Sequence, residues 1–125
     1  MSDFVEHALE LMSGLGDVRA RRMFSGHGIF QGGLMFALVV DDVLYLKANT
    51  ASRDAFVARG LRPFSYAARG KTVSLQYYET PAEIWDDAAE MLHWARLALD
   101  AARQAAMDRQ PRKRSQRSAS TNRKR

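Results

Sequence analysis

Two apolar runs separated by only two residues constrain the fold of this chain most strongly. The run 34-LMFALVV-40 is followed by Asp41-Asp42 and then by 43-VLYLKA-48. Two strand-like segments joined by two turn-tolerant residues are typical of a tight hairpin, whose strands are antiparallel. Phe36 and Val39 fall on opposite faces of the first strand, so this strand is apolar on both sides. We therefore expect it in the centre of an antiparallel sheet.

A second hairpin extends this sheet. It is predicted from 64-FSYAA-68 and 72-TVSLQYY-78, which flank Arg69-Gly70-Lys71. The glycine-rich stretch before Leu34 is interpreted as one further strand with a bend. No helix separates most of the consecutive strands, which favours antiparallel pairing.

Three helices are predicted from their start and stop signals. Ser2 caps the first, over residues 3–13, and the second begins near 49-NT-50 and ends at Gly60. The third begins at 80-TPAE-83, where Thr80 caps and Glu83 closes a capping box; its apolar stripe runs from Ile84 to Ala102, and the helix is expected to extend to Met107. The expected fold class is therefore α+β: a two-layer, mainly antiparallel five-stranded sheet with helices on one face, in the order α-β-β-β-α-β-β-α.

Charge divides the chain into two parts. The sequence has 19 basic and 14 acidic residues, and no acid follows Asp108. Residues 109–125 therefore form a strongly basic tail, whereas residues 1–108 carry a small acidic excess. The tail has almost no apolar groups to offset the entropy of ordering, so we expect a folded domain over 1–108 and a disordered tail over 109–125. The candidate nucleic-acid-binding residues are Arg112, Lys113, Arg114, Arg117, Arg123, Lys124 and Arg125.

The stretch 21-RRMFSGHGIFQGG-33 holds four glycines within eight residues. A phosphate-binding G-x-G-x-x-G loop follows a strand and opens a helix, but these glycines lie between two strand patterns. We interpret Gly32-Gly33 as a hairpin turn, and Gly26 and Gly28 as a bulge or a close approach of two backbones.

The residue types needed for catalysis or metal binding do not cluster in the sequence. Cysteine is absent, which excludes a disulfide, a zinc–thiolate site and a cysteine nucleophile. His7, His27 and His93 are scattered, and Ser25 does not stand in a G-x-S-x-G motif. The prediction is a non-enzyme that has no cofactor and no catalytic, cofactor-binding or metal-binding residues.

The aromatic residues leave two interpretations open. Tyr45 and Tyr78 alternate with polar residues, which would place both on the sheet face away from the helices. That face is either solvated, which we favour, or a platform that stacks nucleic-acid bases. The aromatic residues predicted to fill the core are Phe24, Phe30, Phe36, Phe64 and Tyr77.

Several segments together carry a family resemblance. They are 22-RMFSGHGIF-30, 35-MFALVVDDVLYLKA-48, Pro63-Phe64 with Tyr66, 77-YYETP-81 and Trp94. In this combination the chain resembles the N-terminal domain of the TfoX/Sxy family over about residues 4–102. The resemblance implies a small α+β domain without established catalytic residues. It also implies a regulator of natural competence that promotes transcription of DNA-uptake genes together with the cyclic-AMP receptor protein. Such regulators usually carry a second, helical domain, whereas this sequence continues as the basic tail.

Two function hypotheses follow. The first is a cytoplasmic regulatory protein that acts through protein contacts, by family resemblance with the transcription machinery, while the tail attracts nucleic acid non-specifically. The alternative is a direct, non-specific nucleic-acid-binding module that uses the tail and the sheet face; a small-molecule enzyme has little support. The acidic N-terminus is unlike a signal peptide, and no apolar run approaches the ~20 residues of a membrane helix, so no membrane contact is expected.

Overall fold

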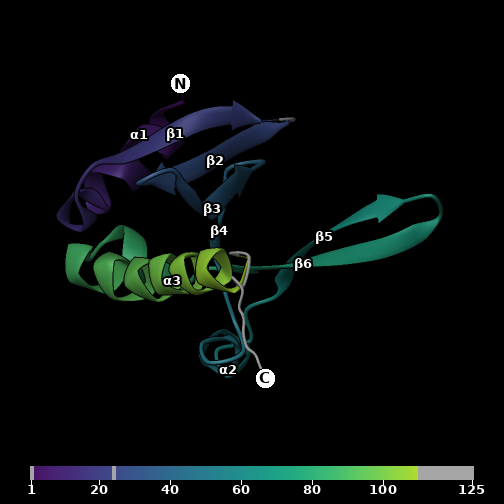
Figure 1. Cartoon of the computed structure of the whole chain (residues 1–125). Coiled ribbons are helices and arrows are strands. Elements are labelled where there is room, and N and C mark those ends of the chain that lie inside the picture. Colours follow the sequence, from purple (N-terminus) through teal and green to yellow (C-terminus); the bar gives the residue numbers. More distant parts are fainter. Residues whose placement is uncertain (1, 24, 110–125) are drawn as a thin grey trace, which may run out of the picture.

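The computed structural model describes residues 2–23 and 25–109 of the chain, and within them one antiparallel sheet is covered by helices (Figure 1). Its six strands follow the spatial order β1-β2-β3-β4-β6-β5. The strands are β1 (Val18–Met23), β2 (Gly26–Gln31), β3 (Leu34–Val40), β4 (Val43–Lys47), β5 (Pro63–Ala68) and β6 (Lys71–Glu79). The helices are α1 (Asp3–Leu11), α2 (Arg53–Val57) and α3 (Ala88–Arg109), with short 3-10 helices η1 (Ser13–Leu15) and η2 (Ala82–Trp85). The α+β class is confirmed.

The expectation of five strands is wrong, because the stretch interpreted as one bent strand forms two. Strands β1 and β2 pair from Val18–Gln31 to Met23–Gly26, so the chain reverses direction between Met23 and Gly26. The sequence there is Phe24-Ser25, which has none of the usual turn residues. The helix and strand order is therefore α-β-β-β-β-α-β-β-α. The turn at Gly32-Gly33 is confirmed, with φ angles of 58° and 82°.

Strand β3 is central, as expected, but its faces are not those that simple alternation predicts. The register with β2 shifts after Ile29, which pairs with Ala37, while Phe30 pairs with Met35. Phe36 is thus the extra residue of a β-bulge, and it joins Ala37 and Val39 in the buried core. The prediction that Phe36 and Val39 lie on opposite faces is wrong because this bulge breaks the period of two.

Helices α1 and α3 begin where a side chain accepts hydrogen bonds from the first free backbone N–H groups. The Ser2 side chain accepts a hydrogen bond from Val5 N at 3.3 Å, which confirms the predicted cap of α1. The predicted capping box at residues 80–83 is wrong. Asp87 Oδ1 instead accepts from Ala89 N at 3.0 Å and opens α3, whereas Glu83 is engaged by an ion pair with Arg59. Helix α2 is shorter than expected and follows reciprocal hydrogen bonds between Asn49 and Ser52.

Helices α1 and α3 cover one face of the sheet, and α3 packs on β3 and β4 (Figure 1). The core lies between these layers and includes Val5, Met12, Ile29, Phe36, Leu46, Met91 and Ala98. No helix of residues 2–23 and 25–109 is both long and apolar enough to cross a membrane.

The β5–β6 hairpin projects beyond the helix-covered part of the sheet (Figure 1). Only the end of β6 joins the rest of the sheet: Tyr77–Glu79 pair with Tyr45–Lys47, and Ala48 N donates to Gln76 O at 2.8 Å. Residues 64–75, here called the arm, form a two-stranded ribbon. Arg69 and Gly70 close it with positive φ angles of 53° and 77°, the geometry of a tight hairpin turn.

Candidate functional site

An apolar groove lies on the sheet face opposite the helices, between the central strands and the arm. Its volume is about 570 Å³. The floor is formed by Met23, Met35, Leu38 and Val40 from β1 and β3, and the opposite wall by Phe64, Tyr66, Leu75 and Tyr77 from the hairpin. The bulge at Phe36 creates the floor, because it turns both Met35 and Leu38 away from the core.

Gly28 makes room for the methionines of this groove. It pairs with Leu38, and a Cβ at its position would lie 2.7 Å from both Met23 Sδ and Met35 Sδ. Its φ is not positive, so the glycine is needed for space and not for backbone conformation. Gly26 serves the same sheet differently, since a Cβ there would overlap the Val39 carbonyl oxygen. The expected close approach of two backbones is therefore confirmed at Gly26.

Tyr77 closes one end of the groove. Its hydroxyl donates a long hydrogen bond of 3.5 Å to the Met35 carbonyl oxygen, which ties the hairpin to the floor. Burial raises the pKa of Tyr77 to about 12. Lys47 Nζ lies 5.0 Å from the centre of the Tyr77 ring, in cation–π contact. Burial, and then the positive charge of Arg109, lower the pKa of Lys47 below its usual value.

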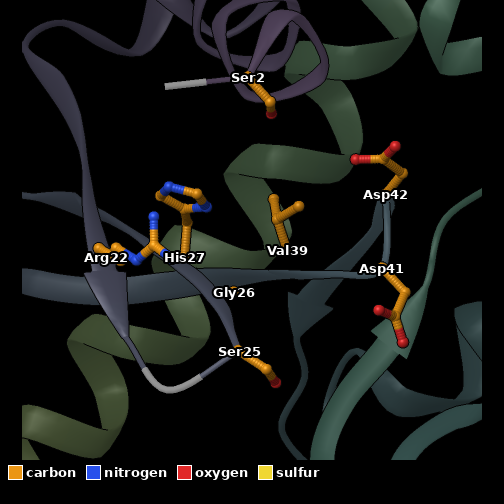
Figure 2. A pocket seen from close by; sticks show the side chains of 8 residues that line it. All are labelled: Ser2, Arg22, Ser25, Gly26, His27, Val39, Asp41 and Asp42. Atoms are coloured by element: carbon orange, nitrogen blue, oxygen red, sulfur yellow. The ribbon is translucent and has the colours of Figure 1, made fainter.

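A second, polar hollow of about 510 Å³ lies near the start of α1 (Figure 2). Arg22 and His27 are cross-strand neighbours in it, and Ser2 approaches from α1. In Figure 2 the side chain of Asp41 points away from His27, and Asp42 lies across the hollow from His27. Residues 2–23 and 25–109 contain no group of three or more His, Cys, Asp or Glu that could hold a metal ion.

Tyr45 and Tyr78, the two tyrosines predicted to stack on bases, lie on opposite faces of the sheet. Tyr78 is 7% exposed, stacks on Phe56 at 5.5 Å and belongs to the core, whereas Tyr45 lies on the groove face. The expectation that both lie on the helix-free face is wrong, because Tyr45 pairs with Glu79 and Leu46 pairs with Tyr78. Two interpretations of aromatic positions also change. Phe30 lies under Arg21 and Phe64 lines the groove, so neither fills the core, and Phe24 lies outside the described residues.

The seven basic candidate residues of the tail are not among the described residues, whereas other basic residues of the folded part are. Arg112, Lys113, Arg114, Arg117, Arg123, Lys124 and Arg125 lie outside the described residues, so their role and the disorder of the tail stay predictions. Within the folded part, Arg21 and Arg22 point to opposite faces of β1, and Lys71 lies at the tip of the arm. Sequence reasoning missed the groove itself. Its available signal was a central strand that is apolar on both faces.

The fold and the groove define the class: a small two-layer α+β domain whose antiparallel sheet is covered by helices on one face only. The model of the TfoX N-terminal domain family matches residues 10–102, and the chain belongs to this family. Protein Sxy of Escherichia coli (strain K12) is 28% identical over 93 residues, which are 74% of this chain. The match spans 44% of the length of Sxy.

Proposed function

We propose that the chain is a cytoplasmic, non-enzymatic regulatory protein that acts through protein contacts and holds a basic tail near nucleic acid. The observation that carries this proposal is the groove. An apolar surface of this size on a small domain is typical of a binding site for a partner. Its lining consists mainly of methionine, aliphatic and aromatic side chains, with Ser25 and His27 beside them, and such a lining suits the binding of a partner.

The family suggests the kind of partner. The chain belongs to the TfoX N-terminal domain family and is similar to Sxy, so we place the partner in the transcription machinery. RNA polymerase and the cyclic-AMP receptor protein are the first candidates, and DNA-uptake genes are the first candidate targets.

The test combines a binding and a transcript measurement. The full chain is immobilised, RNA polymerase and receptor protein are applied with and without nuclease, and DNA-uptake transcripts are counted in cells with and without the chain. We expect retention of a partner that survives nuclease and a change in transcript abundance. Loss of all retention with nuclease, together with unchanged transcripts, would contradict the proposal.

The second candidate is a direct, non-specific nucleic-acid-binding module. It is favoured by the eight basic residues that follow Asp108. Such a charge cluster attracts phosphate without reading sequence. Base stacking on the sheet face receives less support, because Tyr78, one of the two tyrosines expected there, is buried in the core.

A further inference from the structure

Lys47 is a partly buried ammonium beside an apolar groove. It shares the groove face with Tyr77, its cross-strand neighbour, and lies over that ring. In the described part of the chain, the ion pairs between a basic side chain of Lys or Arg and a carboxylate do not include Lys47. They are Arg19 with Asp17, Arg59 with Glu83 and Arg62 with Glu79. A partly buried charge without a counter-ion is costly, and such a site favours the arrival of an anion.

Glu79 is the acid that could have neutralised Lys47, because it lies on the same face two residues beyond Tyr77. Arg62 holds it instead. The Glu79 carboxylate accepts from the Arg62 backbone N–H at 3.1 Å and from its Nη2 at 3.1 Å. These bonds keep the pKa of Glu79 low in spite of its partial burial. The carboxylate is thus fixed on Arg62 and away from Lys47.

The strands that form the groove carry further positive charge outside its lining. The Arg21 guanidinium lies 5.1 Å from the Phe30 ring centre, and Arg69 and Lys71 stand at the tip of the arm. Arg109 adds a positive charge near Lys47 and Tyr77. These cations contrast with residues 1–108 as a whole, in which acids outnumber bases, 14 to 11. Charge complementarity therefore selects an acidic occupant.

We propose that the groove binds a peptide segment of a partner protein in which apolar side chains stand next to a carboxylate. The apolar side chains contact Met23, Met35 and Leu38, and the carboxylate pairs with Lys47. The proposal rests on the proposed function through protein contacts and names the chemistry of the partner. A volume of about 570 Å³ accommodates several side chains, and the flexible thioethers adapt to their shape.

A nucleic acid is the competing occupant, because a phosphate would also pair with Lys47. Base recognition on a single strand relies on exposed aromatic platforms. The floor of this groove is aliphatic and thioether, and Lys47 covers the ring of Tyr77, which is only 7% exposed. Exposed aromatic surface is confined to the wall, where Tyr66 lies next to Phe64 on the arm. The lining therefore favours a peptide.

The experiment selects peptides and then locates them. Short random peptides displayed on phage are selected on the full chain, and an enriched peptide is titrated into protein with isotope-labelled methionine methyl groups. We expect enriched peptides to combine Leu, Phe or Met with Asp or Glu. The methyl signals of Met23 and Met35 should shift, while those of Met12 and Met91 in the core serve as internal controls and stay in place.

Charge reversal tests the role of Lys47. Lys47→Glu should select peptides that carry Lys or Arg in place of the acid, and Lys47→Gln should weaken the acidic peptide about tenfold. Arg53→Glu on α2, an exposed site away from the groove, is the matched control and should change neither result. Unfolding curves of all three variants establish that they are folded.

Three outcomes would overturn the inference. One is that no peptide family is enriched, and another is that the selected peptides do not depend on the charge at position 47. The third is that an oligothymidylate strand shifts Met23 and Met35 at lower concentration than any selected peptide, which assigns the groove to nucleic acid. If RNA polymerase or receptor protein is still retained after nuclease in these cases, the proposed function stands and the contact lies elsewhere.

Discussion

Gly26 shows how closely two strands can approach when one residue has no side chain. A Cβ at Gly26 would overlap the Val39 carbonyl oxygen, which belongs to the backbone and cannot move aside. At Gly28 the neighbours are Met23 Sδ and Met35 Sδ, the ends of flexible side chains. Of these two glycines in β2, Gly26 therefore leaves room for a neighbouring backbone, and Gly28 leaves room for neighbouring side chains.

We predict that Gly26→Ala lowers the free energy of unfolding by about 3 kcal/mol and Gly28→Ala by only about 1 kcal/mol. The difference arises because backbone must shift in the first case and side chains in the second. Urea denaturation of both variants measures it. Equal costs for the two substitutions would show that the sheet relaxes around Gly26.

The second prediction at this scale concerns Tyr77. Its pKa is about 12 in the folded chain, whereas an unfolded tyrosine titrates near 10. Between these values the folded state retains a proton that the unfolded state loses, so stability falls as the pH rises through this window. Ultraviolet titration should show a late tyrosinate step that disappears in Tyr77→Phe. The control Tyr66→Phe, at an exposed site, should leave that step; titration of all four tyrosines together near pH 10 would contradict the assignment.

We predict that Lys47, which the proposed peptide site requires, lowers the stability of the folded domain. Replacing it by Met removes a partly buried charge that has no counter-ion within residues 2–23 and 25–109, and it keeps a long apolar stem over Tyr77. Because the ammonium still reaches solvent and the cation–π contact is lost, the gain in unfolding free energy should be small, about 0.5 kcal/mol. Thermal unfolding measures it, and a clear loss of stability would mean that the ring contact outweighs the burial cost.

At the scale of elements, local chemistry decided which predictions from the sequence were right. The turns at Gly32-Gly33 and Asp41-Asp42 have residues that tolerate positive φ, and Gly70 provides one in the turn of the arm, so these hairpins were predictable. The β1–β2 turn has no such signal, and two strands were therefore merged into one. The register of the strands could not be predicted from local sequence patterns. The bulge at Phe36 and the cross-strand partner of Tyr45 both depend on contacts between segments that are apart in the sequence.

The start of α3 gives a test at the same scale. Asp87 accepts hydrogen bonds from Ala89 N and Glu90 N, whereas Glu83 pairs with Arg59. Asp87→Ala should therefore cost about 1 kcal/mol, while Thr80→Ala should be nearly silent. Chemical denaturation of both variants decides between the two caps. A larger cost for Thr80→Ala would restore the capping box predicted from the sequence.

At the scale of the whole molecule, the charges of tail and body act in opposite directions. Eight basic residues follow Asp108, while acids exceed bases in the preceding part. The balance could be predicted from the sequence alone, but the groove could not. The groove forms between the arm and the central strands, and their relative position depends on the pairing of β4 with β6.

Duplex DNA binding should depend on the tail. We predict that replacing its seven candidate residues by Gln abolishes nearly all affinity at moderate salt, and that binding by the native chain falls steeply as salt is raised. Fluorescence anisotropy with labelled duplexes of two sequences measures both effects. Undiminished binding by the neutralised tail would locate the contact on the folded part and strengthen the nucleic-acid alternative.

The order of the strands leaves β1 and β5 as the two edges of the sheet. An uncovered edge can recruit another copy and begin a polymer. Strand β1 carries Arg19, Arg21 and Arg22 among its six residues, and β5 begins with Pro63, which cannot donate a backbone hydrogen bond. Two β1 edges that met would bring like charges together, so the strand that begins the sheet also discourages fibre growth. Because salt screens this repulsion, colloidal stability should decline as ionic strength increases.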